Sequence, residues 1–385
     1  MNKIKVMSIF GTRPEAIKMS PLVKALEKDE RFESIVCVTA QHREMLDSVM
    51  EIFEIKPQYD LNIMNHGQTI IDISNEVLKG VSSVLNQCKP DIVLVHGDTS
   101  TTLNSALAAF YNKIPVGHVE AGLRSYDIYS PFPEEMNRKL TGSLAEIHFS
   151  PTENNKRNLL KEGIPQEKIF ITGNTVIDAL KSVIKENYIF KSNSLNKIDF
   201  NNRKVILLTT HRRENWGKPM ENIFESVIEL LNLNENVDVV FPMHKNPKIR
   251  ELASKYFNNY LDRVHLINPL EYVDFTNLMN RVYLIMTDSG GIQEEAPALG
   301  KPVIVLRTET ERPEALETGT VKLVGINKEI IVTEVNRLIR DRESYELMSK
   351  SVNPYGDGLA SQRIIGIIEK YFNKTLNSID EFKVL

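Results

Sequence analysis

The chain has 385 residues, of which 42% are hydrophobic and 25% are charged, and its formal net charge is −4. This length suffices for two domains with separate cores, and the composition is that of an ordinary soluble globular protein. The near balance of charge excludes a broad basic surface, so we expect neither nucleic-acid nor membrane binding.

Along the first half of the chain, short β-branched runs alternate with segments of helical periodicity. The spacers carry apolar residues at helical spacing, such as Leu103, Ala106 and Phe110. This alternation predicts a parallel sheet with crossover helices. We predict strands in KVMSIF (5–10), SIVCVTA (34–40), DIVLVHG (91–97), IPVGHVEAG (114–122), EIHFSPT (146–152) and IFITGN (169–174).

The first strand leads into GTRPEAIK, which has the form of a nucleotide-binding turn without the GxGxxG or GxxxxGK[ST] signature. Gly11 permits a tight turn out of the strand, and Pro14 suits the first turn of a helix. Lys18 follows Arg13 by about one helical turn, and both side chains offer positive charge to an anion. Pro21 is expected to kink the helix.

The pattern of strands and helices stops at a polar stretch and then restarts. We predict a first Rossmann-like domain over 1–180, a linker over 181–199 and a second Rossmann-like domain over 200–358. NPYGDG (353–358) breaks the chain before a last helix at 360–373, and 374–385 is expected to be a solvated tail. The strands predicted in this half are KVILLTTH (204–211), DVVFPMH (238–244), RVHLINP (263–269), YLIMTDSGG (283–291), PVIVLR (302–307) and TVKLVG (320–325).

Nearly every predicted strand ends in polar, charged or glycine residues. Ligands of open parallel sheets bind outside the carboxyl ends of the strands, so we expect one ligand to be held between the two domains. Asp98 and Glu120 end neighbouring strands of the first domain, and Glu134 follows on a proline-rich loop. Converging carboxylates would raise at least one pKa and suit acid–base chemistry. Alternatively, Asp98 caps the next helix and Glu134 is a solvated charge.

In the second domain, TDSGGIQEEAP (287–297) carries the clearest binding signal. Gly290 and Gly291 would let backbone N–H groups approach an anion, and Glu295 could accept the hydroxyls of a ribose. The alternative is a plain helix N-terminus whose acidic residues complement the helix dipole. THRREN (210–215) adds His211 and two arginines, either as a phosphate and proton-transfer site or as a solvated basic turn.

Other kinds of site are not indicated. The eight histidines lack the spacing of a metal site, and there is no GxSxG elbow. Cys37 and Cys88 do not indicate a disulfide framework. The N-terminal apolar run is too short for a signal peptide, and no run reaches transmembrane length, so we expect a cytoplasmic protein.

Taken together, the motifs resemble those of the bacterial non-hydrolysing UDP-N-acetylglucosamine 2-epimerases. The likeness runs in order from about residue 4 to about residue 370. It implies a glycosyltransferase-B-like fold with two Rossmann-like domains, an interdomain active-site cleft and a C-terminal helix that returns to the first domain. The motifs are FGTRPEAIKMSPL, HGDTSTT, HVEAGLRS, PFPEEMNR, THRREN, TDSGGIQEEAPALGKPV, TERPE and NPYGDG.

The resemblance also implies reversible conversion of UDP-GlcNAc to UDP-ManNAc, which supplies cell-wall or capsule polysaccharide. The reaction would eliminate UDP to give a 2-acetamidoglucal and then add UDP back, without NAD, a metal or another cofactor. The resemblance also implies that the protein is a homodimer. The catalytic residues implied are Asp98, Glu120, Glu134 and His211. The substrate-binding residues implied are Arg13, Lys18, Leu270, Phe275, Ser289, Gly290, Gly291, Glu295 and Arg312, with Leu270 and Phe275 near the uracil.

Some members of this family bind a second UDP-GlcNAc as an allosteric activator, and Gln41 and His42 match that site. Glu44 and Gly67 depart from residues that some members carry there, so activation stays open. Three other functions also stay open: a hydrolysing 2-epimerase that releases ManNAc, a glycosyltransferase of the same fold, and a catalytically silent sugar-nucleotide-binding protein.

Overall fold

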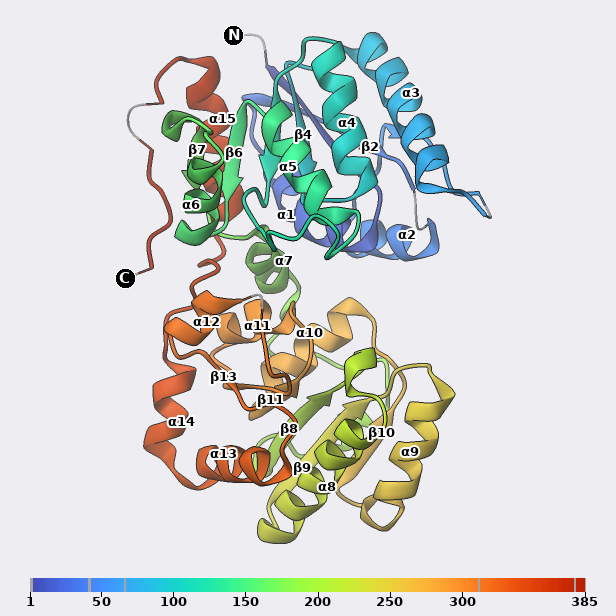
Figure 1. The fold of residues 1–385 in the computed structure, drawn as a ribbon, viewed down its shortest axis with the longest axis vertical. Helices are drawn as coiled ribbons and strands as arrows, with labels where there is room; N and C mark the ends of the chain where they lie inside the picture. The colour runs from blue at the N-terminus through green and yellow to red at the C-terminus, as the bar shows by residue number, and fades with distance from the viewer. Residues whose placement is uncertain (1–2, 41–42, 66, 311, 377–378, 385) are drawn as a thin grey trace. The chain divides into compact units, whose positions relative to one another are not determined.

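The computed structural model describes residues 3–40, 43–65, 67–310, 312–376 and 379–384. The chain divides into two compact units, each with one parallel sheet (Figure 1). The first unit comprises Met1–Ser182 and Tyr355–Lys383, and the second comprises Val183–Pro354 and Val384–Leu385. The predicted class, α/β with two Rossmann-like parallel sheets, is confirmed.

The first unit has a seven-stranded sheet in the order β3-β2-β1-β4-β5-β6-β7, with every pair parallel. The order reverses between β1 and β4, which is the switch point where ligands bind in such folds. The two-residue strand β3 was not predicted, because two residues carry no alternation to detect. The strands are β1 (Ile4–Phe10), β2 (Phe32–Val38), β3 (Tyr59–Asp60), β4 (Ile92–His96), β5 (Val116–Val119), β6 (Ile147–Ser150) and β7 (Ile169–Ile171).

Helices cover both faces of this sheet, which explains why its strands are almost continuously apolar. Residues of α3 and α4 pack on one face, and α1 packs against α2 and α15 (Figure 1). Pro21 lies inside α1, which continues past it to Lys28. The helices are α1 (Arg13–Lys28), α2 (Arg43–Ile52), α3 (Ile70–Cys88), α4 (Ser100–Tyr111), α5 (Glu134–Leu144), α6 (Glu153–Lys161), α7 (Thr175–Val183) and α15 (Ala360–Phe372).

The second unit repeats this design with six parallel strands in the order β10-β9-β8-β11-β12-β13. Its switch point lies between β8 and β11. The strands are β8 (Lys204–Thr209), β9 (Val237–Pro242), β10 (Val264–Ile267), β11 (Leu284–Thr287), β12 (Val303–Val305) and β13 (Val321–Leu323).

A hydrophobic core of the second unit forms where α8, α9 and α13 meet one face of this sheet. Its helices are α8 (Lys218–Leu233), α9 (Pro247–Phe257), α10 (Tyr272–Arg281), α11 (Ile292–Glu295), α12 (Pro313–Glu317), α13 (Lys328–Arg340) and α14 (Arg342–Ser349). The short 3₁₀ turns of this unit are η2 (Leu195–Lys197), η3 (Arg213–Asn215), η4 (Asn258–Tyr260) and η5 (Ala296–Leu299), and a further one, η1 (Gln166–Lys168), lies in the first unit.

Two segments differ from the sequence expectation. In the stretch expected to be a linker, Phe190 and Leu195 are buried within the second unit, so residues 183–199 form part of that unit. In the stretch expected to be a solvated tail, Phe382 is buried and its N–H donates to the carbonyl of Ile171 in β7 (2.8 Å). Buried aromatic side chains therefore fix both segments on the folded units, although the polar composition of these segments predicts exposed chain.

Candidate functional site

The turn between β1 and α1 is filled by the chain's own carboxylate. Oε2 of Glu15 accepts the backbone N–H groups of Gly11 (3.1 Å) and Thr12 (2.8 Å). Its Oε1 accepts the hydroxyl of Thr99 (2.8 Å), at the start of α4. Because Glu15 is buried and takes the N–H groups that a phosphate would use, this turn joins β1 to α4 and does not form a phosphate cradle.

Glu120 follows β5 in the left-handed backbone region, with φ at +61°. Such strain in a residue other than glycine is typical of functional sites. Its Oε2 forms an ion pair with Lys18, accepts the amide of Asn174 (2.8 Å) and lies 3.6 Å from Nε2 of His96. Lys18 was predicted as a substrate-binding residue, and here its ammonium meets the predicted catalytic carboxylate.

Burial would raise the pKa of Glu120, but the charge of Lys18 and the neighbouring His96 outweigh it and hold the pKa well below its usual range. Glu120 is therefore not the carboxylate whose pKa was expected to be raised. Glu120 is ionised at neutral pH and can act as a base without first losing a proton.

Asp98, after β4, is held by the first turns of α5. Oδ2 of Asp98 accepts Nε of Arg138 (2.8 Å) and lies 2.6 Å from its Nη2. Nη1 of Arg138 in turn lies 3.1 Å from Oε2 of the buried Glu135. The side-chain amide of Asn137 donates to the backbone carbonyl of Asp98 (2.8 Å). The helix cap of α4 is Thr99, so Asp98 is not the cap that the alternative reading required.

Glu134 is the first residue of α5, which these contacts tie to the end of β4. Its Oε2 is buried and, among the residues that the structure describes, has no hydrogen-bond partner. The structure thus brings α5, which begins at Glu134, to the strand end that carries Asp98. Register places the ends of β4 and β5 side by side, with His96 opposite Val119, so Glu120 belongs to the same edge of the sheet.

Arg13 opens α1 and is half-buried. Within the described ranges, no side chain or backbone group forms an ion pair or hydrogen bond with its guanidinium. An arginine at the carboxyl edge of the sheet is suited to an anionic ligand. Its role as a substrate-binding residue stays a prediction.

In the second unit, the buried carboxylate of Asp288 organises the turn after β8. Oδ2 accepts the backbone N–H groups of His211 (2.9 Å) and Arg212 (3.0 Å), the hydroxyl of Thr210 (2.9 Å) and the amide of Asn215 (3.0 Å). Oδ1 lies 3.3 Å from Nδ1 of His211, whose side chain is 47% exposed. The ring of His211 stacks on that of His244, with centroids 6.4 Å apart. His211 is therefore fixed on one side and accessible on the other.

Arginines flank the Ser289-Gly290-Gly291 turn. A Cβ added to Gly290 would lie 3.7 Å from the guanidinium carbon of Arg312 and 3.9 Å from Nη2 of Arg212. Arg312 is held by an ion pair with Glu294 (2.6 Å). Because the two glycines have no side chains and two guanidinium groups lie beside them, this turn is suited to a multiply charged anion.

The carboxylate of Glu295 folds back toward the turn, with Oε1 3.8 Å from a Cβ built on Gly291. Leu270 lies before α10 and is half-buried, and Phe275 lies in the first turns of that helix. The allosteric pair Gln41 and His42 lies outside the described residues.

Sequence reasoning missed Glu135, Arg138, Asn174 and the organising role of Asp288. Arg138 stands four residues after Glu134, and this helical spacing could have indicated that the two share a face. Asn174 left no comparable signal, because its contact with Glu120 joins residues 54 positions apart.

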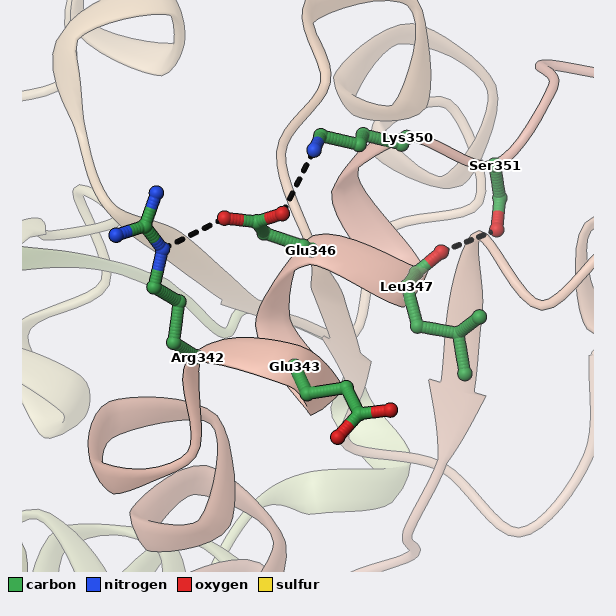
Figure 2. Close-up of a pocket in the computed structure, with 6 residues that line it drawn as sticks. All are labelled: Arg342, Glu343, Glu346, Leu347, Lys350 and Ser351. Carbon is green, nitrogen blue, oxygen red and sulfur yellow. Dashed lines mark hydrogen bonds and ion pairs between the residues drawn. The ribbon is translucent and has the colours of Figure 1, made fainter.

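A shallow surface depression of about 690 Å³ lies on α14 (Figure 2). Glu346 pairs there with Arg342 (2.6 Å) and Lys350 (2.7 Å), and the hydroxyl of Ser351 donates to the carbonyl of Leu347 (2.6 Å). Because its charges neutralise one another and it is remote in sequence from both switch points, we do not assign it a ligand. In the described ranges, no group of three histidine, cysteine or acidic side chains is arranged to hold a metal ion. Nor is any described helix long and apolar enough to span a bilayer.

Comparison with known proteins gives consistent matches. The model of the UDP-N-acetylglucosamine 2-epimerase family matches residues 24–369. The UDP-N-acetylglucosamine 2-epimerase of Escherichia coli K12 is 54% identical over 375 residues, which cover 94% of this chain and 97% of that protein. A solved structure from Listeria monocytogenes is 52% identical, covers 100% of both chains and superposes with a TM-score of 0.94. The UDP-GlcNAc 2-epimerase of Neisseria meningitidis, solved with bound UDP-GlcNAc, is 49% identical, covers 95% of this chain and 100% of that one, and has a TM-score of 0.87.

Proposed function

This chain belongs to the UDP-N-acetylglucosamine 2-epimerase family, and we propose that it interconverts UDP-GlcNAc and UDP-ManNAc by the non-hydrolysing route. The family match confirms the resemblance predicted from the sequence motifs, and the likeness to whole solved structures confirms the glycosyltransferase-B-like fold class. The observation that carries the proposed mechanism is the ion pair of Glu120 with Lys18, at the sheet edge that also carries Asp98.

The chemistry favours elimination. The C2 proton of the sugar is not flanked by a carbonyl, so removing it alone would leave an unstabilised carbanion. When a base takes this proton and the bond from C1 to the UDP oxygen breaks, the products are UDP and 2-acetamidoglucal. Protonation of C2 from the opposite face and return of the UDP oxygen to C1 then give the epimer. No electron is transferred to an acceptor, so the route needs no NAD.

In this proposal the carboxylates of Asp98, Glu120 and Glu134 carry the two proton transfers at C2 and stabilise the positive charge that develops at C1. Glu120 is supported as a proton acceptor because the ammonium of Lys18 lowers its pKa and keeps the carboxylate ionised at neutral pH. Glu134 is supported as a proton carrier by its buried oxygen, for which no partner occurs within the described ranges. Arg138 is proposed to orient the carboxylate of Asp98.

The second unit is proposed to hold the UDP. The turn Ser289–Gly291 would receive the diphosphate beside Arg312, and Glu295 would receive the ribose hydroxyls. Leu270 and Phe275 would contact the uracil. His211, oriented by Asp288, would donate to the departing phosphate oxygen. Arg13 and Lys18 would add positive charge near the phosphates.

The decisive experiment is incubation of the desalted protein with UDP-GlcNAc in deuterated water, followed by proton NMR. We expect a partial equilibrium with UDP-ManNAc and deuterium at C2 of both sugars, without added NAD or metal. Free ManNAc accumulating together with UDP would instead identify a hydrolysing epimerase. Consumption of UDP-GlcNAc only when an acceptor sugar is added, without deuterium at C2, would favour a glycosyltransferase. Full activity of both Asp98→Asn and Glu120→Gln would contradict the assigned roles.

We also propose that the protein acts as a homodimer in the supply of ManNAc-type sugars for cell-wall or capsule polysaccharide. A second UDP-GlcNAc would act as an activator through Gln41 and His42. Sedimentation of the purified protein tests the dimer. Initial rates of the reverse reaction, measured with and without added UDP-GlcNAc, test the activator.

A further inference from the structure

The two oxygens of Glu120 have different surroundings. Lys18 from α1, Asn174 before α7 and His96 from β4 all approach Oε2. Among the described residues, Oε1 has no hydrogen-bond partner. It lies 3.9 Å from the position of a Cβ on Gly97, where no side chain is present. The carboxylate is therefore anchored through one oxygen and open at the other.

Of the two groups that donate hydrogen bonds to Oε2, Asn174 is the more firmly oriented. Its Oδ1 accepts the backbone N–H of Val176 (3.0 Å), and its own backbone N–H donates to the carbonyl of Tyr355 (2.7 Å). Its side chain is buried, whereas the ammonium of Lys18 ends a flexible stem. Because the amide oxygen is occupied, the amide nitrogen can only face Glu120.

We propose that Asn174 is a positioning residue that fixes Oε2 of Glu120, so that Oε1 alone meets the reacting sugar. This inference rests on the proposed epimerase function, because it assigns Glu120 a proton transfer. Lys18 neutralises the carboxylate, and Asn174 sets its rotation. Proton transfer depends steeply on the direction of the accepting lone pair, so a freely rotating carboxylate would be a slower base.

Among the residues that the structure describes, the charged and titratable groups that lower the pKa of Glu120 are Lys18 and His96. A hydrogen bond to the ionised form lowers a pKa, so loss of the Asn174 amide raises the pKa of Glu120. An aspartate at this position raises it further, because a second negative charge then lies at hydrogen-bond distance from the first.

The test uses Asn174→Asp, which keeps the oxygen that accepts the N–H of Val176, and Asn174→Ser, whose hydroxyl can still cap α7 but is too short to reach Glu120. The matched control is Asn112→Asp. It removes amide donors to Ser82 Oγ (3.1 Å) and Ala108 O (2.8 Å) at the far end of α4.

We expect kcat at neutral pH to fall about tenfold in Asn174→Ser and further in Asn174→Asp, with KM changed less than about twofold. In both variants, the limb of the pH–rate profile that reports Glu120 should move to higher pH. The control should keep the wild-type profile. An unchanged profile in Asn174→Asp, or an equal loss in the control, would overturn the inference.

A second measurement needs no turnover. In protein labelled with ¹³C at the glutamate side-chain carboxyl, the Glu120 signal is assigned by its loss in Glu120→Gln and then followed against pH. A higher titration midpoint in Asn174→Asp supports the positioning role, and an unshifted midpoint overturns it. If wild-type protein fails to epimerise UDP-GlcNAc, the proposed function is overturned instead, whatever the midpoint.

Discussion

Asp288 holds His211 through two contacts, a backbone N–H bond to Oδ2 at 2.9 Å and a separation of 3.3 Å between Oδ1 and Nδ1 of the ring. Oδ1 accepts no hydrogen bond among the described residues, so this carboxylate acts on the ring electrostatically, whereas the backbone bond to Oδ2 fixes the start of the turn. The same carboxylate also collects the other donors of the turn after β8. The orientation of His211 and the shape of its turn thus depend on one buried side chain.

Replacing Asp288 with asparagine should impair both functions of this carboxylate. The amide has one acceptor oxygen for several donors, so we expect the free energy of unfolding to fall by about 2–3 kcal/mol and kcat/KM by about 100-fold. Urea unfolding and steady-state epimerisation measure the two effects. Asp341→Asn, at the exposed start of α14, should leave kcat/KM unchanged. Wild-type kcat/KM in Asp288→Asn would show that His211 needs no such support.

Arg138→Lys tests how Asp98 is held. Lysine keeps the charge but cannot span Asp98 and the buried Glu135 at once, because it lacks the planar guanidinium. We expect kcat to fall by about 10- to 100-fold with a smaller change in KM. Arg337→Lys, which alters an ion pair on the surface of α13, should keep wild-type kcat. Equal activity of the two variants would contradict a positioning role for Arg138.

Gly11 should not tolerate a side chain. A Cβ at this position would lie 2.0 Å from Oγ1 of Thr39 and 2.6 Å from Oγ1 of Thr101, two buried hydroxyls 2.9 Å apart. We expect Gly11→Ala to lower the free energy of unfolding by about 1–3 kcal/mol.

The matched control for Gly11→Ala is Gly366→Ala in α15, where a Cβ would meet nothing within 4 Å. It should raise the free energy of unfolding by about 0.5–1 kcal/mol, because alanine favours the helix. Urea unfolding gives both values. Equal effects of the two substitutions would contradict the steric explanation.

Acid should destabilise the first unit through two histidines that lie opposite each other in β5 and β6. Burial lowers the pKa of His118 to about 3 and that of His148 to about 4. Both rings are neutral in the folded state, whereas in the unfolded chain they gain a proton near pH 6.5. Their contribution to stability is therefore complete above pH 6.5 and is lost as the pH falls toward 4.

As the pH falls from 6.5 to 5, each buried histidine should lower the free energy of unfolding by about 2 kcal/mol. Urea unfolding across this range should give a shallower loss for His148→Leu than for wild type. The low pKa of Glu120 does not contribute here, because its stabilisation is lost only below the usual glutamate value of 4.5. Parallel curves for the two proteins would contradict the assignment.

The sheets were predictable because strands buried on both faces form long apolar runs, and each of the twelve that we predicted is present. The local sequence failed where a few apolar side chains are diluted by polar ones. Phe190, Leu195 and Phe382 are buried in segments whose average composition is polar. Their burial depends on partners far along the chain, which no window of local sequence contains.

The candidate site divides along the same line. The positions of Asp98 and Glu120 at one edge of the first sheet, and of His211 after a strand of the second sheet, could be predicted because parallel strands end at the same edge of their sheet. The low pKa of Glu120 could not, since it depends on Lys18, which is 102 positions away and reaches the carboxylate only in the folded unit. Arg138 and Asn174 act through another side chain and carry no motif of their own.

The path of the chain has a consequence for synthesis. The second unit is inserted within the first, whose α15 and Phe382 are made after it. On the ribosome, the second unit can therefore complete its core while α1 still lacks the partner that covers it. A chain that ends near residue 355 would contain the whole second unit joined to an unfinished first one, with the surface of α1 that contacts α15 open to chaperones.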